Sequence, residues 1–179
     1  MEQVQKYFKI VNPNGHNGLV YHDGYNEDPL PFNPNGDCAP GGIYFASSDI
    51  FFFLDYGTDV YEVEPVGKFY KNPKKPKKYK AHALNMQYIG KINDVNTIKY
   101  LVENGANIHA CNDYILRWFA DKGDLEVVKY LVEQGANIHV NNDEVLCISA
   151  EHENVETVKY LIENGADILE LIKYLKSLE

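Results

Sequence analysis

Two side chains early in the chain have the chemistry of a nucleophile and a base. Cys38 stands beside a Pro-Gly-Gly turn at residues 40–42, and His22 lies upstream of it. A thiol becomes a nucleophile when a neighbouring base or positive charge removes its proton. Nothing in the sequence orients or activates this thiol, so we expect Cys38 to be buried rather than catalytic. Cys111 and Cys147 add no paired spacing, so we expect no disulfide framework, no metal and no cofactor.

A basic run at residues 68–80 carries seven lysines and no acidic residue. Such runs are typical of nuclear-import signals and nucleic-acid patches, and Tyr70 and Tyr79 within the run can stack on bases. The alternative is a solvated turn between two modules, which we favour because short basic motifs often occur by chance. Nucleic-acid binding stays a secondary hypothesis, carried by Lys71, Lys74, Lys75, Lys77, Lys78 and Lys80.

The rest of the chain is acidic. Residues 1–67 carry two lysines and ten acidic residues, residues 81–179 carry eight basic and sixteen acidic ones, and the net charge is −9. This balance argues against a chain that binds nucleic acid over its whole surface. The longest apolar run, at residues 50–54, is too short to span a bilayer, and the polar N-terminus has no signal-peptide core. We therefore expect a chain that is neither secreted nor inserted in a membrane.

A repeat fills the second half of the chain. The segment IKYLVENGANIH at residues 98–109 recurs as VKYLVEQGANIH at residues 128–139 and as VKYLIENGADI at residues 158–168, a period of 30. A fixed period of this kind predicts a solenoid, whose stacked units bury an apolar face that one unit cannot bury alone. His109 and His139 occupy equivalent positions, so we expect them to be turn residues rather than ligands.

Each repeat unit can be divided into elements. Apolar residues fall at helical spacing over residues 125–132, and Gly135 ends that helix where a positive φ is favoured. Asp113 and Asp143 precede shorter apolar segments, where an Asp side chain can accept hydrogen bonds from the first N–H groups of a helix. The predicted unit is a short helix, a tight turn, a longer helix, a glycine and an extended linker.

Residues 123–138 (GDLEVVKYLVEQGANI) resemble the turn and second helix of the ankyrin repeat, G-x-L-E-x-V-K-x-L-x-x-x-G-A-x-x. The period of 30 is shorter than the family's 33. The Thr-Pro-Leu-His opening of the family's first helix is replaced by YILR at residues 114–117 and EVLC at residues 144–147. Because the missing residues fall in the linker, we expect the β-hairpin finger to be reduced to a tight turn.

The first half predicts a small α+β module. Strands are expected at residues 5–11, 18–22, 42–45 and 59–64, with a polar loop at 23–38 and a helix capped by Ser47 or Ser48 that runs to Tyr56. The expected domains are this α+β module at residues 1–80 and an all-α ankyrin-type solenoid at residues 81–179. The solenoid would hold a partial repeat at 81–110 with a degraded first helix near 84–90, full repeats at 111–140 and 141–168, and a capping helix at 169–179.

The first module also has family resemblances. The order of its elements, with CAPGGIYF at residues 38–45, FLDYG at 53–57 and YEV at 61–63, resembles the N-terminal region of ankyrin-repeat proteins from giant, mimivirus-like DNA viruses of amoebae. That resemblance covers essentially the whole chain and makes it a short member. It implies a non-enzymatic module that binds a host or viral protein in the cytoplasm or nucleus of the host cell.

A second resemblance suggests an enzyme fold. LVYH at residues 19–22, GIYFAS at 42–47 and VYEVEPVG at 60–67 are similar to the core of ADP-ribosyltransferases. The resemblance implies that His22 and Tyr44 hold NAD. The family's glycine after the His is Asp23 here, and no strand after Gly67 offers a clear catalytic Glu. An NAD-binding or degenerate transferase domain, targeted by the repeats, is therefore the alternative hypothesis.

Two surfaces are candidates for partners. Trp118 and Phe119 are expected in the core. Residues that differ between units at the positions where ankyrin repeats recognise partners are candidates for a concave binding face: Asn112, Arg117, Asp121, Lys122, Asn142, Glu151 and His152. This face is mostly acidic and favours a basic or mixed protein partner. Apolar residues at 168, 171, 172, 175 and 178 predict an amphipathic helix through which two copies of the chain can form a homodimer.

Overall fold

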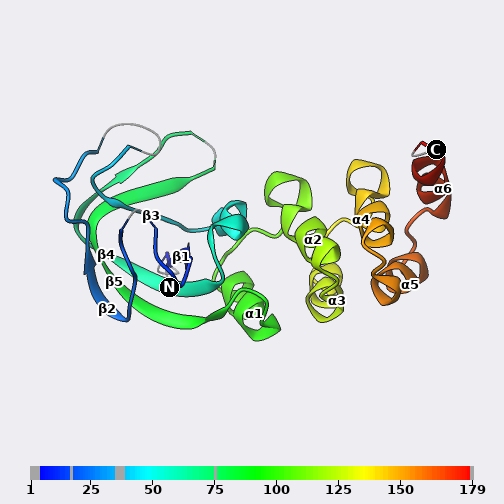
Figure 1. The fold of residues 1–179 in the computed structure, drawn as a ribbon, viewed down its shortest axis with the longest axis horizontal. Helices are drawn as coiled ribbons and strands as arrows, with labels where there is room; N and C mark the ends of the chain where they lie inside the picture. The colour runs from blue at the N-terminus through cyan, green and yellow to red at the C-terminus, as the bar shows by residue number, and fades with distance from the viewer. Residues whose placement is uncertain (1–4, 17, 35–38, 75, 178–179) are drawn as a thin grey trace. The chain divides into compact units, whose positions relative to one another are not determined.

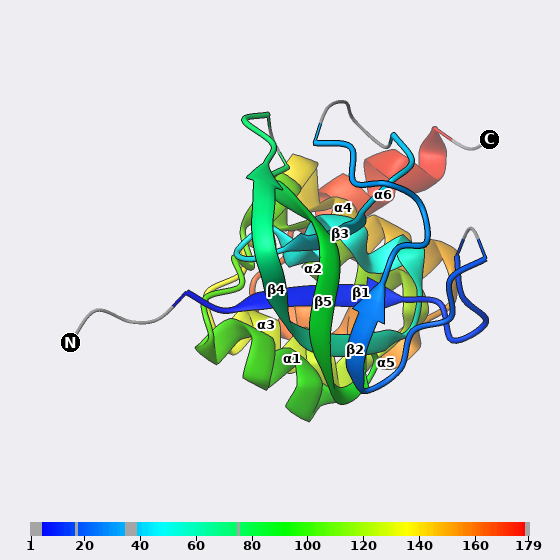
Figure 2. The same cartoon turned by 90° about the vertical axis from the view of Figure 1, so that its left-hand side faces the viewer.

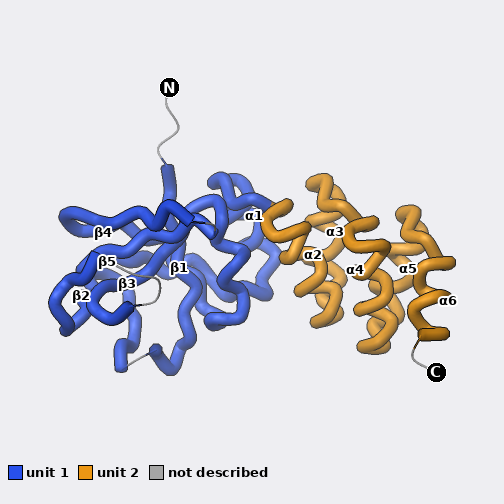
Figure 3. Tube along the Cα trace, turned by 90° about the horizontal axis from the view of Figure 1, so that it is seen from above, with its two compact units in different colours: residues 1–107 blue, residues 108–179 orange. Residues whose placement is uncertain are grey.

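The computed structural model describes residues 5–16, 18–34, 39–74 and 76–177, which form two compact units at residues 1–107 and 108–179 (Figure 3). The first unit contains β1 (Tyr7–Val11), β2 (Gly24–Glu27), β3 (Ile43–Ala46), the 3-10 helix η1 (Ile50–Tyr56), β4 (Asp59–Lys71), β5 (Lys78–Lys91) and α1 (Val95–Glu103). The second contains α2 (Ala110–Lys122), α3 (Leu125–Glu133), α4 (Val140–Glu151), α5 (Val155–Glu163) and α6 (Ile168–Lys176) (Figure 1). The predicted fold class, a sheet-containing module followed by an ankyrin-type solenoid, is confirmed.

The sheet of the first unit is antiparallel throughout and is built around a long hairpin. β4 and β5 pair along their length, as Figure 2 shows, and β2 and β3 pair with β5 as well. β1 pairs with β3 and with β4, so β1, β3, β5 and β4 close into a ring. Closure of this kind removes unpaired edges and places one face of each strand inside.

One hydrophobic core cluster of the unit is formed by side chains of these strands. Its buried residues are Val11, Ile43, Phe45, Tyr61, Val63, Tyr79, Ala81, Leu84 and Met86. The rings of Phe45 and Tyr79 stack with centroids 5.4 Å apart, and Tyr7 meets both edge-on. Aromatic pairs in these geometries contribute about 0.5–1.5 kcal/mol each beyond the area they bury.

Two elements of the first unit differ from the sequence-based expectation. Residues 18–22 are not a strand, because Leu19 bridges back to His16 in a tight turn and β2 begins only at Gly24. The segment expected to be an α-helix capped by Ser47 or Ser48 is the 3-10 helix η1, whose N-cap is Asp49 without a side-chain cap hydrogen bond. The predicted strands at residues 5–11, 42–45 and 59–64 are present as β1, β3 and the first part of β4.

The basic run and the expected partial repeat both lie in the β4–β5 hairpin. β5 spans residues 78–91, so the degraded helix expected near 84–90 is a strand, and the boundary expected between residues 80 and 81 falls inside it. Pairing with β4 explains the difference, since a local helical tendency yields to a long ladder of backbone hydrogen bonds. Residues 68–80 therefore form the end of a hairpin, not a tether between modules.

The second unit repeats a helix pair with a tight entry and exit. The entry is a run of three residues with positive φ, Cys111–Asp113 and again Asn141–Asp143, after which the helical conformation of α2 and α4 begins. At the exit Gly135 has φ +92°, while its N–H donates to Val132 O and the N–H of Ala136 donates to Leu131 O. This hydrogen-bond pair closes a helix in the Schellman motif. Among residues 108–177 there is no strand, so the β-hairpin fingers are reduced to turns, as predicted.

Candidate functional site

The first helices of the repeats form one continuous side of the second unit. α2 packs against α4, and α4 packs against α6 (Figure 1). The repeat period of 30 places Tyr114, Glu144 and Tyr174 at the same position of these three helices. We call this side the first-helix face, and it carries the residues that the sequence proposes for partner binding.

Arg117 crosslinks two repeats on the first-helix face. Its guanidinium lies 3.3 Å from Glu144 Oε2 and donates to the backbone oxygens of Asn112 (3.3 Å) and Cys111 (3.0 Å). The same group lies 5.5 Å from the centre of the Tyr114 ring. Because the Arg117 side chain is only 18% exposed and its donors already have acceptors, it positions the face more than it offers a charge to a partner.

Asp121, Lys122 and His152 form an exposed ion-pair group next to it. Lys122 Nζ lies 2.7 Å from Asp121 Oδ2, and His152 Nδ1 lies 3.2 Å from Asp121 Oδ1. Lys122 also covers the half-buried Trp118 ring at 5.6 Å, whereas Phe119 is fully buried. Trp118 is therefore partly a surface residue, a correction to its expected core position. Exposed pairs of this kind contribute about 0–1 kcal/mol, so a partner can replace them at little cost.

A pocket of about 460 Å³ lies between α4 and α6. It brings together the predicted residues Asn142 and Glu151 with residues that sequence reasoning missed; its full lining is Asn141, Asn142, Glu144, Cys147, Ile148, Glu151, Glu170, Lys173, Tyr174 and Ser177. Three carboxylates face one lysine there. The missed residues could have been found by extending the 30-residue register into α6, where Tyr174 follows Glu144.

Hydrogen bonding within this pocket fixes its polar groups. Tyr174 OH donates to Glu151 Oε2 at 2.7 Å, and this bond to the carboxylate raises the pKa of Tyr174. Lys173 Nζ donates to Glu170 Oε1 at 2.6 Å. Desolvation raises the pKa of the Cys147 thiol, which keeps it protonated and poorly nucleophilic at neutral pH. The pocket is therefore built for polar contact rather than for thiol chemistry.

Comparison with known proteins identifies this array. The family model for ankyrin repeats (3 copies) matches residues 86–171. The chain belongs to the ankyrin-repeat proteins.

Two relatives come from Acanthamoeba polyphaga mimivirus, which confirms the viral resemblance. The chain is 34% identical over 113 residues to ankyrin repeat protein R229, a match that covers 58% of the chain and 37% of R229. It is 35% identical over 118 residues to uncharacterized protein R869, covering 59% of the chain and 82% of R869. The search of solved structures gives no significant match. Ankyrin repeats of this kind indicate a protein-interaction module.

The structure does not bring together the two residues that the transferase resemblance selects. His22 is exposed, and its Nδ1 lies 2.8 Å from the backbone oxygen of Asp23. Tyr44, on β3, lines a pocket of about 380 Å³ to which His22 does not contribute. Cys38 lies outside the described residues, and within them no cluster of His, Cys, Asp or Glu has the arrangement of a metal site.

The basic patch is smaller than the sequence suggests. Lys71, Lys74 and Lys77 are exposed, and Lys78 is half-buried. Lys80 is completely buried on β5, and its Nζ donates to the backbone oxygen of Ala39 at 2.8 Å, so it is not part of any surface patch. Lys75 is outside the described residues. In the part of the chain that the structure describes, no helix is long and apolar enough to cross a membrane.

Proposed function

We propose that this ankyrin array binds a basic segment of a host or viral protein through its first-helix face, in the cytoplasm or nucleus of the host cell, without chemistry of its own. The observation that carries the proposal is the pocket between α4 and α6. It is open to a side chain from outside, and Glu144, Glu151 and Glu170 supply carboxylates that suit lysine or arginine.

The charge of the whole array supports the same kind of partner. Residues 108–179 contain six basic and fourteen acidic residues, a net charge of −8. A field of one sign accelerates encounter with a partner of the opposite sign and disfavours acidic competitors. Because this contribution is screened by salt, we expect the affinity to fall as the ionic strength rises.

The size of the face sets the strength of binding. A stable protein interface buries about 800 Å² on each partner, and only three first helices contribute here. We therefore expect a transient complex, in which the half-exposed Asp121 exchanges its ion pairs for contacts with the partner. Arg117 stays paired with Glu144 and keeps the face in register.

Charge reversal on two opposite sides of the array tests the proposal. Variant Glu151→Lys/Glu170→Lys changes the pocket, and the matched control Glu126→Lys/Glu163→Lys makes the same charge change on α3 and α5. Partners captured from host and infected-cell lysates by each chain would be quantified by mass spectrometry, and captured proteins would be titrated by calorimetry at two salt concentrations.

The expected result is a partner that is retained by the wild-type chain and the control but lost by the pocket variant, with weaker binding at high salt. Equal retention by both variants, or the absence of any partner that binds directly in the titration, would refute the proposal.

A further inference from the structure

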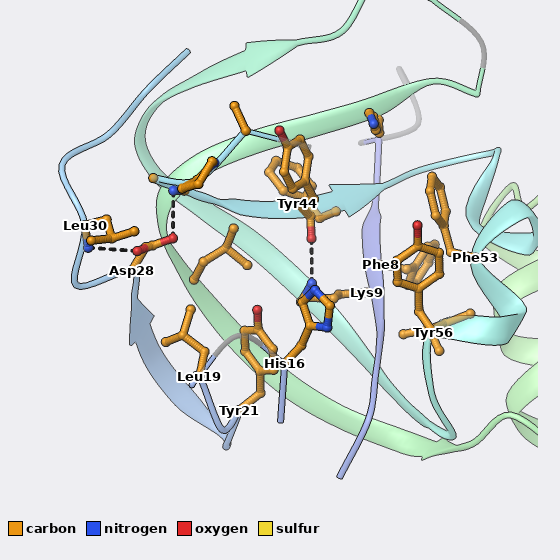
Figure 4. A pocket seen from close by; sticks show the side chains of 18 of the residues that line it. Phe8, Lys9, His16, Leu19, Tyr21, Asp28, Leu30, Tyr44, Phe53 and Tyr56 are labelled. Carbon is orange, nitrogen blue, oxygen red and sulfur yellow. Dashed lines mark hydrogen bonds between the residues drawn. The ribbon is translucent and has the colours of Figure 1, made fainter. Parts of the chain in front are cut away.

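The pocket beside Tyr44 in the first unit is a ligand site of a different kind from the ankyrin face. It has a volume of about 380 Å³ and takes its lining from β1, β3, η1, the loops before β2 and β3, and the first residue of β5. Besides Lys9 and Asp28, the titratable side chains that line it include His16 and Lys78, whose Nζ lies 5.1 Å from the centre of the Tyr44 ring. Figure 4 shows Leu30 at one end, Phe53 and Tyr56 at the other, and Lys9 between them. Cavities of this size with mainly apolar walls are typical of small-molecule sites.

Its walls are apolar and in part exposed to solvent. Ile10, Ile43 and Ile50 are buried in the wall, whereas Leu30 and Tyr56 are 49% and 56% exposed. Apolar side chains that border a pocket yet remain in contact with water are covered when an apolar ligand binds, and this burial favours binding.

Glycine shapes one side of this cavity. Gly41 has φ +85°, and a Cβ placed there would lie 2.2 Å from the backbone oxygen of Pro31. Lys80 holds the neighbouring segment through its 2.8 Å bond to Ala39 O. The two ends of the loop between β2 and β3 are thus held at backbone contact, and Asn33 N donates to Gly41 O at 2.9 Å, so this wall is formed before any ligand arrives.

Two charged side chains in the pocket, Asp28 and Lys9, differ in how fully their hydrogen-bonding capacity is used. Asp28 already accepts two backbone hydrogen bonds, from Leu30 N and from Gly42 N, both at 2.8 Å. Lys9 Nζ donates to Tyr44 O at 2.8 Å and lies 4.8 Å from the centre of the Tyr21 ring. Among the described residues, no carboxylate lies within ion-pair distance of Lys9. Within the described residues, this ammonium group therefore has donors to spare and no counter-ion, which is a costly arrangement in an apolar pocket.

We propose that this pocket binds a medium-chain aliphatic carboxylate, whose carboxylate pairs with Lys9 and whose chain lies along the apolar wall. The carboxylate supplies a counter-ion that no described residue provides. The aliphatic chain covers Leu30 and Tyr56. Neither contact requires the ankyrin face, so the two proposals can fail independently.

The protonation of Lys9 gives a signature that non-specific binding lacks. Desolvation lowers the pKa of Lys9 to about 8, and a bound carboxylate raises it again because it favours the charged form. Binding therefore takes up protons from solution, and the uptake grows between pH 7 and 9. Calorimetry in buffers of different ionisation enthalpy measures it directly.

The test titrates the full chain with hexanoate, octanoate and decanoate, and with decanol and decyltrimethylammonium as uncharged and cationic counterparts. Each added methylene should raise the affinity by up to about fourfold until the cavity is full. Lys9→Met should weaken decanoate binding by at least about tenfold, abolish the proton uptake and leave decanol binding within about twofold. The matched control Lys71→Met, on an exposed part of β4, should change nothing.

Leu19→Trp, which fills the cavity while retaining Lys9, should abolish binding of both decanoate and decanol. The proposal is overturned if no acid in the series binds saturably, if decyltrimethylammonium binds as tightly as decanoate, or if Lys9→Met binds decanoate like the wild-type chain. If Lys9→Met does not fold, the wild-type proton uptake decides, and its absence overturns the proposal.

Discussion

Replacing Asp143 by alanine should destabilise the ankyrin array by removing a tie between the start of α4 and the linker that follows α5. The carboxylate is buried, and its Oδ1 accepts from the backbone N–H of Asp167 at 3.1 Å and from His139 Nδ1 at 3.0 Å. Asp113 makes the equivalent bonds, to Asn137 N at 3.1 Å and to His109 Nδ1 at 2.9 Å. The sequence predicts that these aspartates cap their own helices, but each instead binds the linker that follows the second helix of its own repeat.

The two hydrogen bonds of Asp143 contribute different amounts to the free energy of unfolding. A hydrogen bond to a charged acceptor contributes about 1.5–3 kcal/mol, and this value applies to the backbone N–H of Asp167. The His139 side chain is 55% exposed, so its pair with Asp143 is screened and contributes about 0–1 kcal/mol. Asp143→Ala should therefore cost about 2–3 kcal/mol, Asp143→Asn about half as much, and His139→Ala less than about 1 kcal/mol.

The single tryptophan makes the measurement specific. Trp118 lies in α2, so urea unfolding followed by its fluorescence reports on the array, while circular dichroism reports on the whole chain. Asp121→Ala, a half-exposed position whose loss should cost less than about 0.5 kcal/mol, is the matched control. A cost of His139→Ala equal to that of Asp143→Ala, or a cost of Asp143→Ala below about 0.5 kcal/mol, would refute the assignment of the tie to the backbone bond.

Three further changes test other parts of the structure. The folded-state pKa of Lys9 is lowered from 10.5 to about 8. Between these pH values the unfolded chain binds a proton that the folded chain does not, so the free energy of unfolding should rise with pH there. Lys9→Met should be more stable than the wild-type chain at pH 7 and should lose this rise, as measured by urea titrations at pH 7 to 9.5. Gly135→Ala places a side chain at φ +92° with open space around it, so it should cost about 1–2 kcal/mol from backbone strain alone, and a neutral result by Trp118 fluorescence would contradict the strain. Ile172 and Leu175 are 42% and 47% exposed on α6; if this helix mediates a homodimer, Ile172→Ser/Leu175→Ser should lower the mass measured by light scattering at high concentration, and an unchanged mass would exclude this interface.

The repeat could be predicted from the sequence because the same short motif occurs three times and each copy determines its own helix and turn. The 30-residue spacing fixes Gly135 at the end of α3, and the structure places it there with positive φ. The role of Asp113 could not be predicted, because it accepts from the backbone N–H of Asn137, 24 residues along the chain in the linker that ends the repeat. A side chain before a helix has the same local pattern whether it caps that helix or binds elsewhere.

The secondary structure of the first unit is harder to predict from the sequence, because its strands depend on pairing with segments that are distant along the chain. β2 lies in a segment that looks like a polar loop, and only pairing with Ala83–Met86 on β5 makes it a strand. Lys80 looks like one more lysine in a basic run, yet ring closure buries it between Tyr44 on β3 and Tyr70 on β4. The position of Lys9 cannot be predicted from the sequence, since alternation in a short strand gives no sign that its ammonium faces an apolar pocket.

The repeat motif and the compact units do not end at the same residue, and α1 explains why. α1 carries the same motif as α3 and α5, but it belongs to the first unit, where strand β5 stands in the place of a first helix. Tyr100 on α1 accepts from Lys6 Nζ at 2.7 Å and donates to Glu62, and its ring meets Phe8 edge-on at 6.4 Å. Thr97 also lies so close to Gly90 that a Cβ there would be 2.2 Å from its Oγ1. Polar and aromatic contacts thus fix this repeat helix to the sheet. Tyr130 in α3 and Tyr160 in α5 occupy the same repeat position as Tyr100, but they belong to the second unit, whose described residues form no sheet. Within the first unit the sheet therefore gives α1 the packing partner that a first helix gives α3 and α5 in the array.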